Sequence, residues 1–175
     1  MRIKQNWMYF KYLIRHKYYV MKACHMLGLG TWVGLKHDMS KFLPSEWIPY
    51  KECFYDETGK KRYLETEEFI NAWFLHQKRN KHHWQYWLLT LDKGNVQAVK
   101  MPERYMVEMV ADWIGAGIAI TGEMEVWEWY KANRNNMTLH PETRNDVEML
   151  LRWTKIIHNK EEIKDRIYER NLPKN

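Results

Sequence analysis

Helical spacing of apolar side chains runs along almost the whole chain and constrains its fold more than any other feature. Apolar residues recur at intervals of three and four, and short clusters of Gly, Pro, Asn or Asp separate the segments that carry this pattern. No internal repeat, low-complexity tract or Pro/Gly-rich linker divides the sequence. The pattern predicts an all-α protein, folded as a compact single-domain helical bundle.

The boundaries of the predicted helices come from start and stop signals. Ser45 and Thr66 are N-cap candidates, Pro102 and Pro141 suit the first turn of a helix, and glycines follow two of the apolar runs. A short extended piece is expected before Pro102. The predicted helices span approximately residues 5–27, 45–55, 66–89, 102–122, 123–133 and 141–159, with a charged helix after them.

Length and composition support one well-packed domain. The chain has 175 residues, of which 45% are hydrophobic and 15% aromatic, so a large aromatic surface has to be buried and a disordered chain is excluded. We expect residues 1–160 to form the helical domain. Residues 161–175, which mix acidic and basic side chains, are expected to form a charged C-terminal helix or tail.

Charge and hydropathy argue against several functional classes. The net charge is +6, and Lys and Arg are spread along the chain; this favours a small anionic partner over a nucleic acid, for which no binding motif is recognisable. Charged residues and glycines interrupt the most apolar early stretch, residues 18–35, so no membrane association is expected. Only two cysteines, Cys24 and Cys53, and no apolar run of signal-peptide type predict a reduced, cytoplasmic protein.

The segment from His37 to Lys41 places an imidazole, a carboxylate and an ammonium within five residues. His37 and Asp38 can supply a nitrogen and an oxygen to one divalent ion, and Lys41 can contact an anion that the ion also holds. The simpler interpretation is a helix-start Asp beside a surface His, with Lys41 capping its segment. The metal hypothesis gains weight from candidate ligands elsewhere in the chain: His16, His76, His82, His83 and Asp112.

Three of these histidines fall within eight positions of the helix predicted over residues 66–89. Helical spacing places His76, Asn80 and His83 on one stripe, whereas His82 lies about 100° around the helix from His83. On this geometry His83 is the stronger ligand candidate. The alternative, a basic helix face packed by tryptophans, accounts for the neighbouring Trp residues but leaves the histidines unexplained.

Asp112 lies in a helix that is otherwise mostly apolar, one turn after Glu108. A carboxylate there faces the core and needs a partner, which is either a metal ion or a Lys, Arg or Trp side chain. Glu108 is expected to support a ligand or to lie at the surface. Glu46 is expected either to support a ligand or to act as a first-turn charge of its helix.

The order His16, His37-Asp38, Asp112 resembles the HD-domain superfamily of metal-dependent phosphohydrolases, in which a His, a His-Asp pair and a distant Asp lie on helices. More narrowly, the chain is similar to a family of uncharacterised bacterial and phage proteins. The shared motifs are His16-Lys17 with Tyr19-Val20, His37-Asp38-x-Ser40-Lys41-Phe42 with Pro44 and Glu46, Asn80-x-His82-His83-Trp84-x-Tyr86-Trp87, and Glu108-Met109 with Asp112-Trp113.

The resemblance implies an all-α fold of HD-domain type with one or two divalent ions at its centre. His16, His37, Asp38 and Asp112 match the four-ligand set of the superfamily, and His76, His82 and His83 are the candidates for a second ion. Oxygen ligands beside histidine favour Mn, Fe, Mg or Co over structural Zn.

The resulting hypothesis is a metal-dependent phosphohydrolase that acts on a small phosphate ester or a nucleotide through a metal-activated water. Asp38, Lys41 and Arg79 are the predicted catalytic residues, with Lys41 and Arg79 neutralising the charge of the substrate. Two alternatives stay open. One is a di-iron oxygenase on the same scaffold, and the other is a non-catalytic phage or bacterial interaction protein whose cluster is vestigial.

Overall fold

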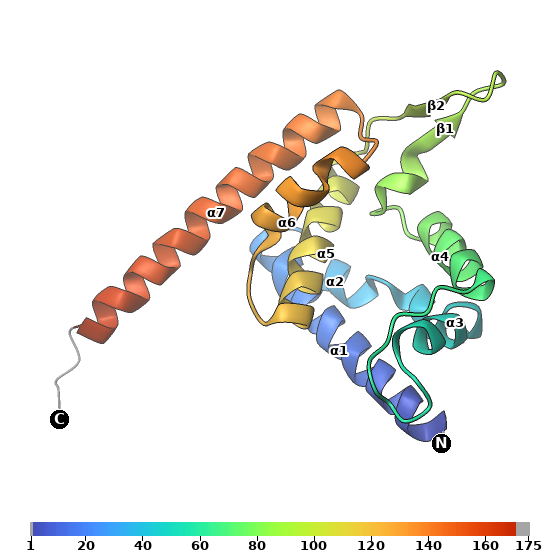
Figure 1. Cartoon of the computed structure of the whole chain (residues 1–175). Helices are drawn as coiled ribbons and strands as arrows, with labels where there is room; N and C mark the ends of the chain where they lie inside the picture. The colour runs from blue at the N-terminus through green and yellow to red at the C-terminus, as the bar shows by residue number, and fades with distance from the viewer. Residues whose placement is uncertain (1, 171–175) are drawn as a thin grey trace.

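The computed structural model describes the backbone of residues 2–170 and the side chains of residues 3–158, and it confirms the all-α prediction (Figure 1). The α-helices are α1 (Arg2–Met26), α2 (Thr31–Lys36), α3 (Pro44–Phe54), α4 (Glu67–Arg79), α5 (Glu103–Thr121), α6 (Val126–Asn133) and α7 (Pro141–Arg170). The shorter elements are the 3₁₀ helices η1 (Met39–Phe42), η2 (Trp84–Trp87) and η3 (Arg134–Asn136), and the strands β1 (Leu88–Thr90) and β2 (Val96–Ala98).

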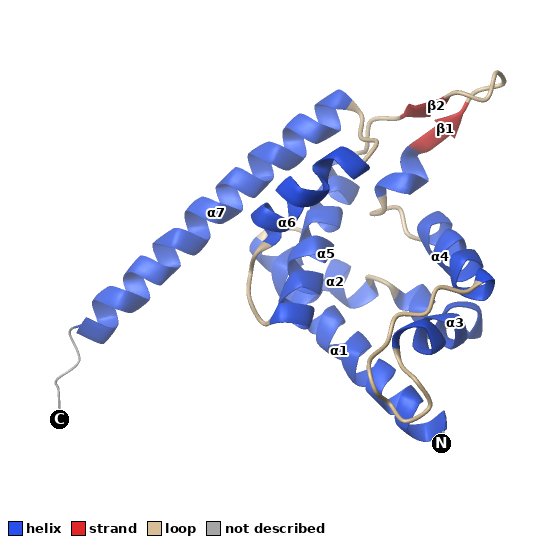
Figure 2. Cartoon of the chain, viewed as in Figure 1, coloured by secondary structure: helices blue, strands red, loops and turns tan. Residues whose placement is uncertain are grey.

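Helix α1 organises the bundle. It packs along α5 and against α2, while α3 packs against α4 on the other side of the molecule. The antiparallel hairpin of β1 and β2, the small strand pair in Figure 2, projects from the bundle next to the end of α4. Helix α7 packs on α5 and α6 through its first half and then extends away from them (Figure 1).

The buried face of α1 explains how a histidine comes to lie in the core. Its buried residues include Tyr9, Leu13, His16, Val20 and Ala23, at intervals of three and four that define one helical face. Four of these side chains supply aromatic or aliphatic surface to the core. His16 and Gln5, each with only 2% of its surface exposed, are polar members of this face.

Two glycines allow other backbones to approach α1 closely. A Cβ atom built on Gly34 would lie 2.3 Å from Cα of Met21, and one built on Gly115 would lie 2.5 Å from the backbone nitrogen of Val20. No side chain fits at such distances, so these positions require glycine. We expected Gly34 to belong to the break after the first helix, but it lies inside α2, where it sets the contact with α1.

The expected helix over residues 66–89 is wrong in its second half. Helix α4 ends at Arg79, where the side-chain amide of Asn80 donates to the carbonyl oxygen of His76. His82 and His83 therefore lie in a turn, and η2 leads into the hairpin. The hairpin turns at Gly94, whose φ of 82° is available to glycine at little cost. This turn makes the extended piece before Pro102 one strand of a pair.

Two other boundaries differ from the prediction. Leu43, not Ser45, occupies the N-cap position of α3, because Pro44 fits the first helical position without a backbone N–H. Helix α7 continues to Arg170 without the break expected near residue 159. The division of the chain at residue 160 stays a prediction, and residues 171–175 lie outside the described residues.

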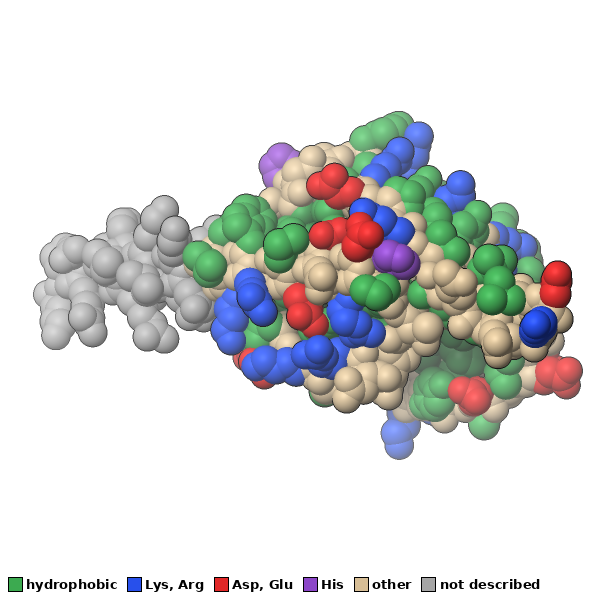
Figure 3. Space-filling view, turned by 90° about the horizontal axis from the view of Figure 1, so that it is seen from above, with side chains coloured by type: hydrophobic (Ala, Val, Ile, Leu, Met, Phe, Trp, Pro, Cys, Tyr) green, Lys and Arg blue, Asp and Glu red, His purple; other side chains and the backbone are tan. Residues whose placement is uncertain are grey.

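The surface of the described region shows no sign of a membrane span. Within residues 2–170, no helix is both long enough and apolar enough to cross a bilayer. On the face drawn in Figure 3, acidic side chains lie next to basic ones.

Candidate metal centre

All seven predicted metal ligands meet at the centre of the bundle, between α1, α4 and α5. They form two groups that share Asp38, and within each group the ligand atoms lie within 4.8 Å of one another. The first group consists of His16, His37, Asp38 and Asp112. The second group consists of Asp38, His76, His82 and His83.

Asp38 is the member common to both groups, and its two oxygens face in different directions. Oδ2 lies 3.5 Å from Nε2 of both His16 and His37. Oδ1 lies 3.3 Å from Nε2 of His76 and 3.4 Å from Nε2 of His82. A carboxylate placed in this way can contact a cation through either oxygen.

The backbone at Asp38 is held in an unusual conformation. Its φ of 55° and ψ of 26° are left-handed, and it is the one non-glycine residue of the described chain with a positive φ. Asp tolerates this region better than most residues, but at a cost in energy, so the surrounding contacts have to enforce it. Lys17 on α1 contributes by donating hydrogen bonds to the carbonyl oxygens of Leu35 and His37.

Asp112 completes the first group from α5. Its Oδ1 lies 3.2 Å from Nε2 of His16 and 3.2 Å from Nε2 of His37. The close packing of α1 on α5 at Gly115 brings these side chains together, since Gly115 follows Asp112 by less than one helical turn. The structure therefore pairs this largely buried carboxylate with two histidines.

Two glutamates contact the Nδ1 atoms of the imidazoles, on the side of each ring away from Asp38. Glu108 Oε1 lies 3.1 Å from Nδ1 of His37 and 3.5 Å from Nδ1 of His82, so one carboxylate supports a member of each group. Glu46 Oε2 lies 2.7 Å from Nδ1 of His76. An imidazole that donates from Nδ1 presents the lone pair of Nε2 to the centre, which is the usual support for a metal-ligating histidine.

Glu108 can itself be grouped with His37 and His82 as a third set of possible ligands. The Nε2 atoms of both histidines already face Asp38 and Asp112, so a cation at Glu108 would compete with the two main positions. We therefore assign Glu108 a supporting role. Its spacing of four residues from Asp112, one turn of the same helix face, was the sequence signal for this role.

The unpaired atoms at the centre fit a metal site. Among the described residues, the Nε2 atoms of His76, His82 and His83 and Oδ1 of Asp38 are buried and have no hydrogen-bond partner. Leaving one buried polar atom unpaired costs about 1–3 kcal/mol. A cluster of such atoms around one carboxylate is explained if they hold a cation, because each then gains a strong interaction.

The charge balance at the centre agrees with this interpretation. Burial and the neighbouring histidines lower the pKa of His82 and His83, which keeps both imidazoles neutral, the form that binds metals. Burial would also lower the pKa of His37, but the charges of Asp38 and Asp112 outweigh it and raise that pKa to about 10. Without metal, a protonated His37 thus offsets the carboxylates.

The two predicted substrate-binding cations lie in different places. Nζ of Lys41 is 2.5 Å from Oδ2 of Asp38, directly at the centre. Arg79 instead donates to Oε1 of Glu46 at 2.7 Å and to the hydroxyl of Ser45. Its guanidinium therefore lies behind the ligand-supporting glutamate, away from the ligand atoms of both groups.

The structure brings His76, His82 and His83 together by a different route from the one that helical spacing predicted. His83 was expected to join His76 through one α-helical stripe, with His82 turned aside. The chain leaves the helix at Asn80, and the turn that follows brings both rings to the centre, with their centroids 4.2 Å apart. Nε2 of His82 lies 3.4 Å from Oδ1 of Asp38, and its Nδ1 lies 3.5 Å from Oε1 of Glu108.

Two pockets flank the centre. One has a volume of about 310 Å³ and reaches His83 and Asp112 between the rings of Trp73, Trp84 and other tryptophans. The other has a volume of about 370 Å³ and contains Lys41. A larger cavity of about 840 Å³, between the start of α5 and α7, contains none of the ligands and lies away from the centre.

Comparison with known proteins identifies the family but not the activity. A model described as a family of unknown function (DUF5662) matches residues 5–153, and the chain belongs to this family. The matched range contains every residue of both ligand groups. No curated protein and no solved structure matches the chain. Its function therefore has to be argued from the side chains at the centre.

Proposed function

We propose that this protein is a metal-dependent phosphohydrolase of HD-domain type that acts on a small phosphate ester, such as a nucleotide. The observation that carries the proposal is the position of Asp38, whose two oxygens face two separate groups of imidazole nitrogens. A carboxylate shared in this way is the arrangement expected for a pair of divalent ions that act together on one phosphoryl group.

The donor set favours transition metals. In this proposal His16, His37, Asp38 and Asp112 hold one ion, and Asp38, His76, His82 and His83 hold the other. With three imidazoles in the second group, Mn, Fe or Co is a better match than Mg, which prefers oxygen ligands. Such ions, when bound, lower the pKa of a coordinated water and polarise a phosphoryl oxygen.

The chain's own groups contribute orientation and charge. Glu46 and Glu108 accept hydrogen bonds from the Nδ1 atoms and so fix which imidazole nitrogen faces the centre. Lys41 holds a buried ammonium beside Asp38, where it attracts the anionic substrate. Arg79 keeps Glu46 charged and oriented, so in this proposal it acts through Glu46 and not on the substrate.

The test is elemental analysis of the purified protein followed by a hydrolysis screen. We expect a stoichiometric transition metal and metal-dependent release of phosphate from phosphomonoesters or nucleotides. The Asp38→Asn variant should lose both metal and activity, because an amide is a poor bridging ligand. Asp92→Asn, an exposed position in the hairpin turn, is the matched control and should keep both.

Two outcomes would replace the proposal. Bound iron with oxygen-dependent turnover and no phosphate release would identify the centre as that of a di-iron oxygenase. A protein that binds no stoichiometric metal, and whose Asp38→Ala variant keeps its biological function, would be a non-catalytic interaction protein.

A further inference from the structure

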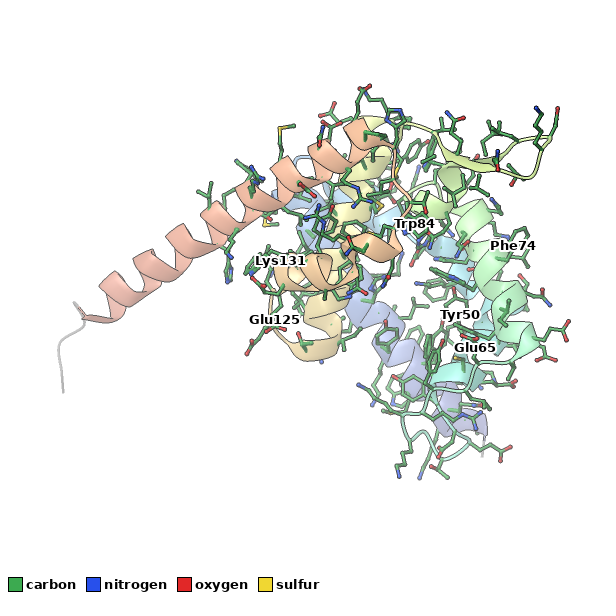
Figure 4. All side chains as sticks on the ribbon, turned by 45° about the horizontal axis from the view of Figure 1, so that its top comes forward. Tyr50, Glu65, Phe74, Trp84, Glu125 and Lys131 are labelled. Carbon is green, nitrogen blue, oxygen red and sulfur yellow. The ribbon has the colours of Figure 1, made fainter. Side chains whose placement is uncertain are left out.

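A pocket on the Lys41 side of the centre is lined by tyrosines that no sequence motif marked. Its volume of about 370 Å³ falls within the range of small-ligand sites, roughly 300–1,000 Å³. Tyr9 on α1 and Tyr50 on α3 line it on either side of Lys41. Figure 4 labels Tyr50 and Glu65, which lie near each other beside α4 and border the same pocket.

The hydroxyls of Tyr9 and Tyr50 are buried and have no hydrogen-bond partner among the described residues. Their side chains are 1% and 4% exposed, and packing fixes both rings. Tyr9 meets the edge of Trp47 with ring centroids 4.8 Å apart, and Tyr50 meets Phe69 at 5.2 Å. Two rigid donors of this kind are costly unless a partner enters the pocket.

Lys41 adds a cation to the two hydroxyls. Its ammonium carries three N–H donors, and Asp38 engages it at 2.5 Å through one oxygen, so other donor directions remain. Nζ lies 5.7 Å from the centre of the Tyr50 ring.

The geometry points to a phosphoryl-binding subsite: we propose that the hydroxyls of Tyr9 and Tyr50 and the ammonium of Lys41 donate hydrogen bonds to the non-bridging oxygens of the substrate's phosphoryl group. This inference rests on the proposed function. It also predicts that the phosphoryl group enters the Lys41 pocket and not the tryptophan pocket on the other side, because no Lys or Arg is among the residues that line the tryptophan pocket.

One acidic group borders the subsite and limits its charge. Glu65 lines the same pocket, and its Oε2 accepts a hydrogen bond from the hydroxyl of Tyr63 at 2.8 Å. This bond ties the carboxylate to the loop before α4. Burial raises the pKa of Tyr9 and Tyr50, so both phenols stay protonated and act as donors.

The test measures the binding of inorganic phosphate by calorimetry, with the Tyr9→Phe and Tyr50→Phe variants of the full chain. Each variant removes one hydroxyl and keeps the ring. We expect each to weaken phosphate binding about tenfold, as for the loss of one hydrogen bond to a charged group. Since the hydroxyls lack protein partners, the unfolding midpoint should stay unchanged or rise.

Tyr130→Phe is the control, because its buried hydroxyl bonds Glu148 and lies outside the pocket. This variant should lose stability and keep phosphate affinity. Equal phosphate affinity in wild type and both pocket variants, a wild type that binds no phosphate, or lower stability of the pocket variants overturns the subsite. Phosphate binding through Tyr9 and Tyr50 without ester hydrolysis supports the subsite and overturns the proposed function alone.

Discussion

Nδ1 of His76 lies 2.7 Å from Oε2 of Glu46, and both side chains are fully buried. Ser40 and Arg79 donate to the same carboxylate, so Glu46 is charged and fixed before any ligand arrives. The consequence is that the lone pair of His76 Nε2 faces Asp38. A residue without a contact to the metal positions thereby determines which nitrogen is available there.

Replacing Glu46 with Gln should therefore weaken the second metal position. The amide keeps the size of the side chain but removes the charge that Arg79 and His76 share. We expect metal affinity to fall by roughly 10- to 100-fold, the usual effect of losing a supporting carboxylate. Titration with Co²⁺, followed by its visible absorption, measures this. Glu52→Gln, at an exposed position of the same helix, is the control, and equal affinity in all three proteins would contradict the supporting role.

Single-ligand variants should separate the two positions. His16 belongs only to the first group and His83 only to the second, whereas Asp38 belongs to both. Replacement of His16 or His83 by Ala should halve the bound metal, and Asp38→Asn should remove nearly all of it. Asn tolerates the left-handed backbone at this position, so the fold should survive. Elemental analysis and circular dichroism test both points. If the two groups instead form one site, all three variants should lose the same fraction of the bound metal.

The pKa of His37 predicts a dependence on pH. In the metal-free protein this pKa is raised from 6.5 to about 10. Protonated His37 therefore contributes stability that is complete below pH 6.5 and is lost as the pH rises through about 10. Metal binding has to displace this proton, so it should release protons at pH 7.

Two measurements check this prediction. Unfolding midpoints of the chelator-treated protein should fall between pH 7 and pH 10, and the His37→Gln variant should show a smaller fall. Calorimetry of metal binding in buffers of different ionisation enthalpy should report proton release. The prediction is wrong if the binding enthalpy is the same in every buffer.

The sequence was sufficient to predict the fold class and the side chains that meet at the centre, but the reasons differ between residues. His16 was predicted from its place in the order His16, His37-Asp38, Asp112, and Asp112 because it is a carboxylate in a mostly apolar helix. The role of Glu108 followed from its spacing to Asp112. The contacts of His82 could not be predicted, because they depend on where α4 ends and how the hairpin turns.

The unpaired hydroxyls of Tyr9 and Tyr50 could not be predicted from the sequence, for a different reason. Neither residue was singled out from the sequence, and both are buried among other aromatic side chains. That their hydroxyls lack partners beside Lys41 depends on the packing of α1 against α3, two helices with no shared sequence pattern. The composition predicts that aromatic surface is buried, whereas a tyrosine hydroxyl without a hydrogen-bond partner can be recognised only in the tertiary structure.

The approach of α1 to α5 at Gly115 links packing to the metal centre. A Cβ at this position would lie 2.5 Å from both Cγ2 and the backbone nitrogen of Val20. Gly115→Ala should therefore push the helices apart and lower the free energy of unfolding by about 1–3 kcal/mol. His16 lies on α1 and Asp112 on α5, so the first metal position should weaken more than the second, which draws its histidines from α4 and the turn after it.

Gly117 provides the matched control for this variant. It lies in the same helix, but the nearest atom to a Cβ built there is 4.0 Å away, so Ala fits without strain. Gly117→Ala should stabilise the protein by about 0.5–1 kcal/mol, because glycine is a poor helix former. Chemical denaturation with and without metal compares the variants. If Gly115→Ala loses stability but binds both ions with wild-type affinity, the spacing between α1 and α5 does not control the centre.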